Sequence, residues 1–302
     1  MSISELFESF RLLFRRHVTV TFQNSQITYD GFPHRASYKA EGLPEGYKLA
    51  PLDQVALKNA TEDFVEVSAS HYRILSPSGA DVTTRFIIRT ISGKMRIVPK
   101  ALTIKTGTAE KTWDGLPLRQ TRVQINGICP NDNLAVTATG ELTDVGSCKN
   151  TCIVDWQNST ADPANYNLSF ELGTLTISPA SLRIVQSSYS VEYDGTPHPL
   201  RVNVPAGATL HIQDNESFVD AGIYERVFTV SMPNHTSYSG TAQLTVLPRR
   251  LTLTTNSDEK RFDGTALSNQ SVKVTGLVNG EILEVRALGS ITEPGSVKNP
   301  AE

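Results

Sequence analysis

Four aspartates stand in nearly the same phrase along the chain and are the first candidates for chemistry. Each follows an aromatic residue and precedes a glycine, in the triplets Tyr29-Asp30-Gly31, Trp113-Asp114-Gly115, Tyr193-Asp194-Gly195 and Phe262-Asp263-Gly264. Carboxylates in such a pattern could bind calcium or act as acids. No phrase contains a second acidic residue, however, and a phrase used four times is typical of repeated architecture rather than of a catalytic site.

The phrase has the composition of a turn between two strands. An aromatic residue that ends a strand can close the end of a sandwich core, the Asp can cap turn N–H groups, and the Gly can adopt a positive φ. His34 and His198 follow the phrase in two copies, whereas Leu118 and Leu267 stand there in the other two. Because a required ligand would not be replaced by leucine, we interpret the histidines as packing or rim residues.

Three cysteines, Cys129, Cys148 and Cys152, lie in one third of the chain. The repeat described below aligns Cys129 with Val278 and Cys148 with Val297. One interpretation is therefore that they are small buried apolar residues. The alternative is a disulfide within one module, with Cys129 close to Cys148 or Cys152, which an exported protein could form.

These residues belong to an internal repeat. Residues 102–150 align with residues 251–299 without a gap, at a constant offset of 149, and the "YDGFPH" and "YDGTPH" phrases mark a second type of unit. The repeats predict an N-terminal leader helix followed by four modules of alternating type, with the boundaries 1–17, 18–100, 101–180, 181–249 and 250–302. The last module lacks the closing stretch of its copy, so we expect it to be truncated and the least stable of the four.

The local patterns are those of strands and turns. Each complete module ends in an alternating strand followed by proline, at Pro99, Pro179 and Pro248, and the next strand begins within three residues. We therefore expect short, stiff linkers in an elongated array. The predicted fold is mainly β, with small modules that are either immunoglobulin-like β-sandwiches or β-grasp-like sheets. The β-grasp fold needs a helix, for which residues 52–67 are the candidate.

Composition and motifs exclude several functions. The net charge is −3, which argues against a nucleic-acid-binding surface. No apolar run is long enough to span a membrane, and no nucleophile elbow, phosphate loop, zinc-protease motif or EF-hand loop occurs. We therefore predict no enzymatic activity, no catalytic residues, no metal site and no cofactor.

Several phrases resemble the tandem repeats of bacterial surface proteins called YDG-type or MBG domains. They are "YDGTPH", "DVTTRF" with "GKMRIVP", "KVTGLVNGEILEV" with "GSITEPGSVKN", and "NYNLSFELGTLTISPA". The resemblance implies an extracellular, non-enzymatic stalk that holds a binding region away from the cell wall. The alternative is that the modules themselves bind a glycan or a host protein. The chain has neither the secretion signal nor the sorting signal of such proteins, so we expect a monomeric segment of a longer protein.

Overall fold

The computed structural model describes residues 15–185, 188–278 and 280–302. Most of the predicted leader helix, residues 1–14, lies outside the described residues. The first strand begins at Arg16, two residues before the expected boundary at Val18, so Arg16 and His17 belong to the first module. The chain divides into two compact units, Met1–Ser178 and Pro179–Glu302, and each contains two of the predicted modules.

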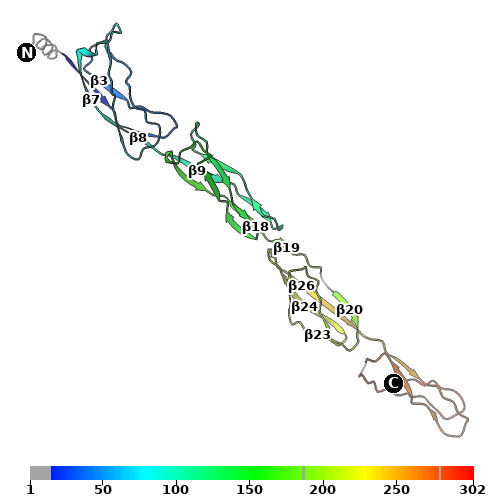
Figure 1. Cartoon of the computed structure of the whole chain (residues 1–302). Coiled ribbons are helices and arrows are strands. Elements are labelled where there is room, and N and C mark those ends of the chain that lie inside the picture. Colours follow the sequence, from blue (N-terminus) through cyan, green and yellow to red (C-terminus); the bar gives the residue numbers. More distant parts are fainter. Residues whose placement is uncertain (1–14, 186–187, 279) are drawn as a thin grey trace, which may run out of the picture. The chain divides into compact units, whose positions relative to one another are not determined.

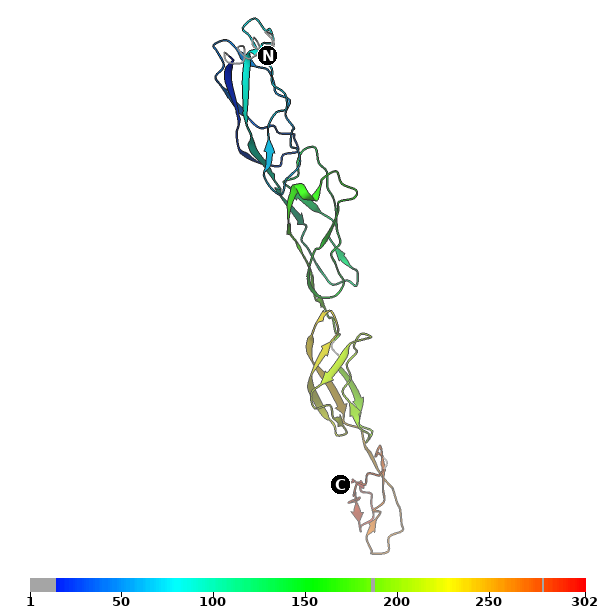
Figure 2. The same ribbon diagram turned by 60° about the vertical axis from the view of Figure 1, so that its left-hand side comes forward.

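The described residues form a mainly β fold (Figure 1; Figure 2). Three strands begin one or two residues before the expected module boundaries, at Arg16, Lys100 and Ala180. No α-helix occurs among the described residues, and the helical elements are two short 3-10 turns, η1 (Thr83–Arg85) and η2 (Pro163–Asn165). The helix expected at residues 52–67 is therefore wrong, and with it the β-grasp alternative. The backbone of Leu57 instead exchanges hydrogen bonds with that of His34, and such tertiary pairing overrides a weak helical pattern.

The first module is a small sandwich of mixed sheets. Its strands are β1 (Arg16–Phe22), β2 (Ser25–Thr28), β3 (Tyr38–Glu41), β4 (Lys48–Leu49), β5 (Val65–Val67), β6 (Ile74–Leu75), β7 (Phe86–Ile91) and β8 (Gly93–Val98). The sheets run β3-β1-β7, β2-β8-β5 and β4-β6. The core is shared between the two larger sheets, because Val18, Val20 and Phe22 of β1 pack in one cluster with Met95 of β8.

The second module repeats this arrangement. Its strands are β9 (Lys100–Thr106), β10 (Ala109–Thr112), β11 (Leu118–Arg119), β12 (Val123–Asn126), β13 (Ala135–Ala138), β14 (Glu141–Leu142), β15 (Gly146–Lys149), β16 (Cys152–Asp155), β17 (Tyr166–Glu171) and β18 (Thr174–Ser178). The larger sheets run β12-β9-β17 and β10-β18-β15. In both modules the first strand pairs in parallel with the penultimate one, and the second strand pairs in parallel with the last.

The third module contains a four-stranded sheet, β20-β26-β24-β22, and two smaller pairs. Its strands are β19 (Ala180–Ser181), β20 (Ser188–Glu192), β21 (His198–Pro199), β22 (Thr209–Ile212), β23 (Ser217–Phe218), β24 (Gly222–Ser231), β25 (His235–Thr236) and β26 (Tyr238–Leu247). Alternate residues of β24 and β26 are buried, including Phe228, Val230 and Leu244. The alternation that the sequence shows in these strands therefore places one face of the sheet on the core.

The fourth module has two short strand pairs, β27-β29 and β28-β30. These strands are β27 (Thr252–Thr255), β28 (Leu267–Ser268), β29 (Val272–Thr275) and β30 (Ser290–Ile291). Ala287 is the one buried apolar residue among those described after residue 249. Leu251 and Leu253 are 41% and 40% exposed, whereas their counterparts Leu102 and Ile104 in the second module are fully buried.

Candidate functional site

The aromatic-Asp-Gly phrase forms the predicted turn in all four modules. The glycines Gly31, Gly115, Gly195 and Gly264 have φ of 86°, 80°, 71° and 78°. Each Asp Oδ1 accepts the backbone N–H two residues later, for example that of Phe32 on Asp30 and that of Thr196 on Asp194. The carboxylate therefore has a local structural partner in every copy.

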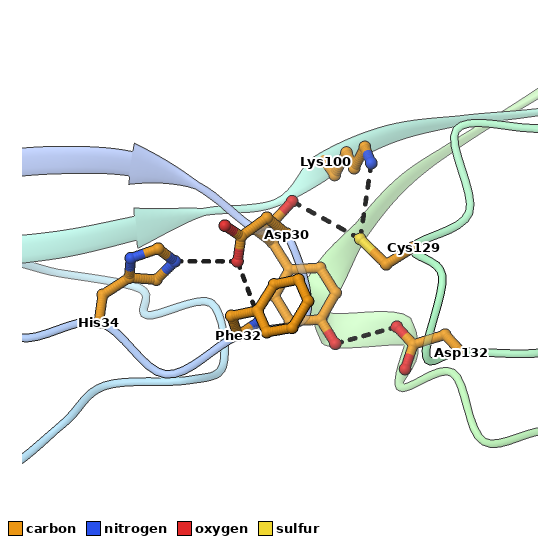
Figure 3. Close-up of polar contacts among 7 residues, drawn as sticks. Asp30, Phe32, His34, Lys100, Cys129 and Asp132 are labelled. Atoms are coloured by element: carbon orange, nitrogen blue, oxygen red, sulfur yellow. Dashed lines mark hydrogen bonds and ion pairs between the residues drawn. The ribbon is translucent and has the colours of Figure 1, made fainter.

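Each of these aspartates also contacts a basic side chain. In the first and third modules the partner is the histidine that follows the phrase. Nε2 of His34 lies 2.9 Å from Oδ1 of Asp30 (Figure 3), and Nε2 of His198 lies 2.9 Å from Oδ1 of Asp194. In the second and fourth modules a lysine three residues before the Asp binds it instead, in the ion pairs Lys111–Asp114 and Lys260–Asp263. The histidines are therefore carboxylate partners rather than simple packing residues, and leucine can replace them where a lysine takes over.

These contacts lower the pKa of the four carboxyls. For Asp30 the main cause is the His34 hydrogen bond, and for Asp114 it is the bond from Lys111. The Thr196 hydroxyl, its N–H and His198 bring the pKa of Asp194 down to about 2. The turns thus stay charged and capped at any physiological pH, which suits a structural role and not that of a catalytic acid.

Tyr29 does not simply close the core of its own module, as expected, but enters the junction with the next one. It is 3% exposed and packs in a cluster with Ile97, Leu102 and Cys129. Its hydroxyl donates to Oδ2 of Asp132, at 2.9 Å (Figure 3). The turn of the first module is thereby fixed to a carboxylate 103 residues away in the second.

Tyr166 completes this junction from the first residue of β17. Its ring meets that of Tyr29 edge to face, with centroids 5.4 Å apart, and its hydroxyl donates to the same Oδ2 of Asp132 at 2.5 Å. The backbone N–H of Cys129 donates to the Tyr166 hydroxyl. Two tyrosines and one carboxylate therefore form a connected, mostly buried network, an arrangement in which each hydrogen bond reinforces the others.

A second strut connects the same two modules. Asn165, 2% exposed, accepts the backbone N–H of Ala60 on Oδ1 at 2.7 Å and contacts Asn59 with Nδ2. The nearby Thr61 N–H donates to Ile97 of β8. Residues 59 and 60 of the segment expected to be a helix thus lie in a loop that contacts the second module.

The other unit contains a related but exposed contact between the third and fourth modules, without a counterpart of Tyr166 among the described residues. The Tyr193 hydroxyl donates to Oε1 of Glu281, and Glu281 is the residue that the offset of 149 aligns with Asp132. Oε2 of Glu281 accepts the N–H of Val278, the counterpart of Cys129. The glutamate carboxylate thus accepts the Val278 N–H directly. In the first junction the Tyr166 hydroxyl lies between the equivalent Cys129 N–H and Asp132. We call the two contact sets the tyrosine junctions.

The first tyrosine junction should be sensitive to alkali. Burial, and then the hydrogen bond to Asp132, raise the pKa of Tyr29 to about 12. A raised pKa means that the folded state favours the neutral hydroxyl of Tyr29. The stability that this hydroxyl contributes is therefore complete below the normal pKa of about 10 and is lost as the pH rises to about 12. We expect the difference in tyrosinate absorbance between the parent chain and Tyr29→Phe to show one tyrosine titrating near pH 12. Titration near pH 10 would contradict a buried junction.

The glycine of the phrase packs on the following module, which a matched pair of variants can test. A Cβ on Gly195 would lie 2.7 Å from Cγ1 of Val278, whereas a Cβ on Gly115 would meet nothing within 4 Å. Both positions have positive φ, so valine should cost about 1–3 kcal/mol from backbone strain at either one. We expect Gly195→Val to destabilise its unit further than Gly115→Val does, as measured by hydrogen exchange in the full chain. Equal effects would show that the contact with Val278 is unimportant.

All three cysteines are free thiols, so the disulfide alternative is not borne out. Cys129 lies in the loop after β12, fully buried at the junction, with its Sγ near the Tyr29 carbonyl and 3.5 Å from Nζ of Lys100. Cys148 and Cys152 belong to β15 and β16, in other sheets. Cys129 thus fits the small buried apolar residue that its alignment with valine indicates.

Within residues 15–185, 188–278 and 280–302, no group of three or more His, Cys, Asp or Glu side chains is placed to hold a metal ion. No described helix has the length and apolarity that crossing a membrane requires. Tyr166 is a buried member of the cluster that contains Tyr29, and Trp156 packs against that cluster.

Sequence reasoning missed the carboxylates of the tyrosine junctions. Asp132 and Glu281 lie in the divergent phrases "NDNL" and "NGEI", far from the tyrosines that they bind. The available signal was that an acidic residue occupies the aligned position in both copies. Asn165 gave no comparable signal, because residue 165 plus 149 exceeds the length of the chain.

Comparison with known proteins finds no matching family and no matching curated protein. Among solved structures, the chain is similar to Drosophila N-cadherin EC1-4, with 10% identity and a TM-score of 0.23 over 77% of this chain and 76% of that one. It is also similar to the human Desmocollin-1 ectodomain, with 10% identity and a TM-score of 0.18 over 95% of this chain and 77% of that one.

Proposed function

We propose that the chain is a non-enzymatic structural region of an extracellular bacterial surface protein, in which the modules hold a binding region away from the cell. The observation that carries this proposal is the tyrosine junction, which occurs once in each unit. A spacer needs neighbouring modules held at a defined angle, and a hydrogen-bonded contact, buried in the first unit and exposed in the second, supplies this better than a flexible linker does.

The short connections support the same role. Only Pro99 separates β8 from β9, and proline removes both a donor and a rotatable φ. The resemblance of the sequence to YDG-type repeats also supports a stalk. The aromatic-Asp-Gly phrase forms a turn in each module, and its tyrosine forms a junction in the first and third modules. The aspartates therefore have assigned structural partners, which leaves the phrase without a free reactive group.

Small-angle scattering of the full chain tests the proposal. A spacer should give an elongated particle, and replacing both Tyr29 and Tyr193 with alanine should broaden its distance distribution by releasing the two junctions. Tyr72→Ala, a change outside the junctions, is the control. A compact particle with the radius of gyration of one 302-residue globule, about 19 Å, would contradict the proposal. Specific binding of the chain to a host glycan or protein would favour the alternative, a direct binding module.

A further inference from the structure

Cys129 and Lys100 form a thiol–amine pair at the first tyrosine junction. Nζ of Lys100 donates to Sγ of Cys129 at 3.5 Å, and the thiol donates in turn to the Tyr29 carbonyl oxygen (Figure 3). Cys129 is fully buried and Lys100 is partly buried. Lys100 forms no ion pair with a carboxylate of the described residues, so its amine is held beside the sulfur without a competing acidic partner.

The other unit lacks this pair. The offset of 149 aligns Cys129 with Val278 and Lys100 with Arg249. A tyrosine junction can therefore form without the thiol and without the lysine, as the contact between Tyr193 and Glu281 shows. The pair thus adds something to the first junction that the hydrogen bonds of a junction do not require.

Burial determines which oxidants can reach the thiol. A soluble disulfide exchanges only by direct contact with the sulfur, so it cannot react with Cys129 in the folded chain. Dioxygen is small and apolar and can enter a packed apolar interior. The same burial keeps water and larger oxidants away, so a first oxidation product of Cys129 meets the Lys100 amine before it meets another reagent.

We propose that Cys129 and Lys100 form a covalent bridge through one oxygen atom, Sγ–O–Nζ, when the protein is exposed to dioxygen. The S–H bond and one N–H bond of the neutral amine break, and an S–O bond and an O–N bond form. One atom of dioxygen enters the bridge, and the other leaves as water with the two hydrogens. Sulfur and nitrogen each lose two electrons, and dioxygen gains these four. The structure shows the pair in its reduced state.

The bridge makes the rigidity of the first tyrosine junction depend on oxygen, which goes beyond a spacer function. Lys100 is the first residue of β9, directly after the linker residue Pro99. Cys129 lies in the loop that also carries Asp132, and its N–H donates to the Tyr166 hydroxyl. A link across 29 positions of the chain would restrict the opened state of this loop, as a disulfide does. Two molecules of a dithiol supply the four electrons and four hydrogens that restore the thiol and the amine and release water.

The intact mass of the full chain tests for the bridge. One sample is kept under nitrogen with dithiothreitol, and the other is held in air with a metal chelator. We expect the sample in air to be about 14 Da heavier, because it gains one oxygen and loses two hydrogens, and ¹⁸O₂ should raise this gain to about 16 Da. Dithiothreitol should remove the gain, which a methylation of similar mass would survive. An unchanged mass in air, or a gain that resists dithiothreitol, would overturn the proposal.

Matched variants and peptide mapping locate the bridge. Lys100→Arg and Cys129→Val, which introduce the residues of the other unit, should each abolish the gain, whereas Cys148→Ser should retain it. Trypsin should leave the chain uncut after Lys100 and release a linked pair of peptides that contain Lys100 and Cys129. A gain that persists in Lys100→Arg or Cys129→Val, or oxygen on Cys129 alone as a sulfenic or sulfinic acid, would show that the bridge does not form.

Hydrogen exchange tests the effect of the bridge on the junction. Residues 129–132 should exchange more slowly in the oxidised chain than in the reduced chain, and this difference should disappear in Lys100→Arg. Equal exchange in the oxidised and reduced parent chains would show that the bridge does not stiffen the junction.

Discussion

Ile104→Ala is expected to cost the second module about 2–5 kcal/mol of stability, the usual effect of truncating a buried isoleucine. Its counterpart Leu253→Ala is expected to cost less than about 1 kcal/mol in the fourth module, because Leu253 is 40% exposed and its truncation creates little cavity. Ile104 lies on β9 between Ile125 of β12 and Phe170 of β17, and β27 has no described strand in the place of β17.

Hydrogen exchange with mass spectrometry measures both variants in the full chain, because it reports each module separately. In the parent chain residues 250–302 should exchange faster than residues 101–180. Appending a copy of residues 154–180 after Glu302 should slow exchange in the fourth module and make Leu253→Ala as costly as Ile104→Ala. Equal protection of the two modules in the parent chain would show that the missing strands are unimportant.

Asn150→Ala should destabilise the second module by about 2–4 kcal/mol. Asn150 is fully buried, and its Nδ2 donates to the carbonyls of Gly107 and Gln120, both at 2.9 Å. Its removal would take the side-chain donor from two partly buried carbonyl oxygens, and each buried acceptor left without a partner costs about 1–3 kcal/mol.

Asn299 provides the matched comparison. Its Nδ2 donates to the carbonyls of Asn256 and Asn269, the aligned positions, but the side chain is only partly buried. Water can replace the lost donor there, so Asn299→Ala should cost less than about 1 kcal/mol. Hydrogen exchange of each module during chemical denaturation measures the loss of stability in the Asn150→Ala and Asn299→Ala variants. If Asn299→Ala cost as much stability as Asn150→Ala, burial would not determine how much these two hydrogen bonds stabilise a module.

The turn was predictable from the sequence because its interactions are local. Asp30 caps an N–H two residues away, and Gly31 needs a positive φ that the adjacent residues impose. The mainly β fold and the repeat register followed in the same way from alternation, prolines and the constant offset. These features depend on short segments, in which residue type alone limits the available conformations.

The junctions were not predictable in the same way, because their partners are brought together only by the fold. Tyr29 was expected to close its own core, and nothing near it in the chain points to Asp132. The segment 52–67 carries a weak helical pattern, but its backbone bonds to His34, Ile97 and Asn165 in three other parts of the unit. Local propensity of a few tenths of a kcal/mol per residue is smaller than the sum of such contacts.

The two tyrosine junctions also bear on how the chain could have grown. Tyr29 with Asp132, and Tyr193 with Glu281, each join a module of one type to the following module of the other type. The junction contacts therefore make a pair of modules the natural unit of gain or loss. Recombination that inserts or removes one pair would keep every tyrosine with its carboxylate, whereas loss of a single module would separate them. Length variants of this protein should consequently differ by even numbers of modules.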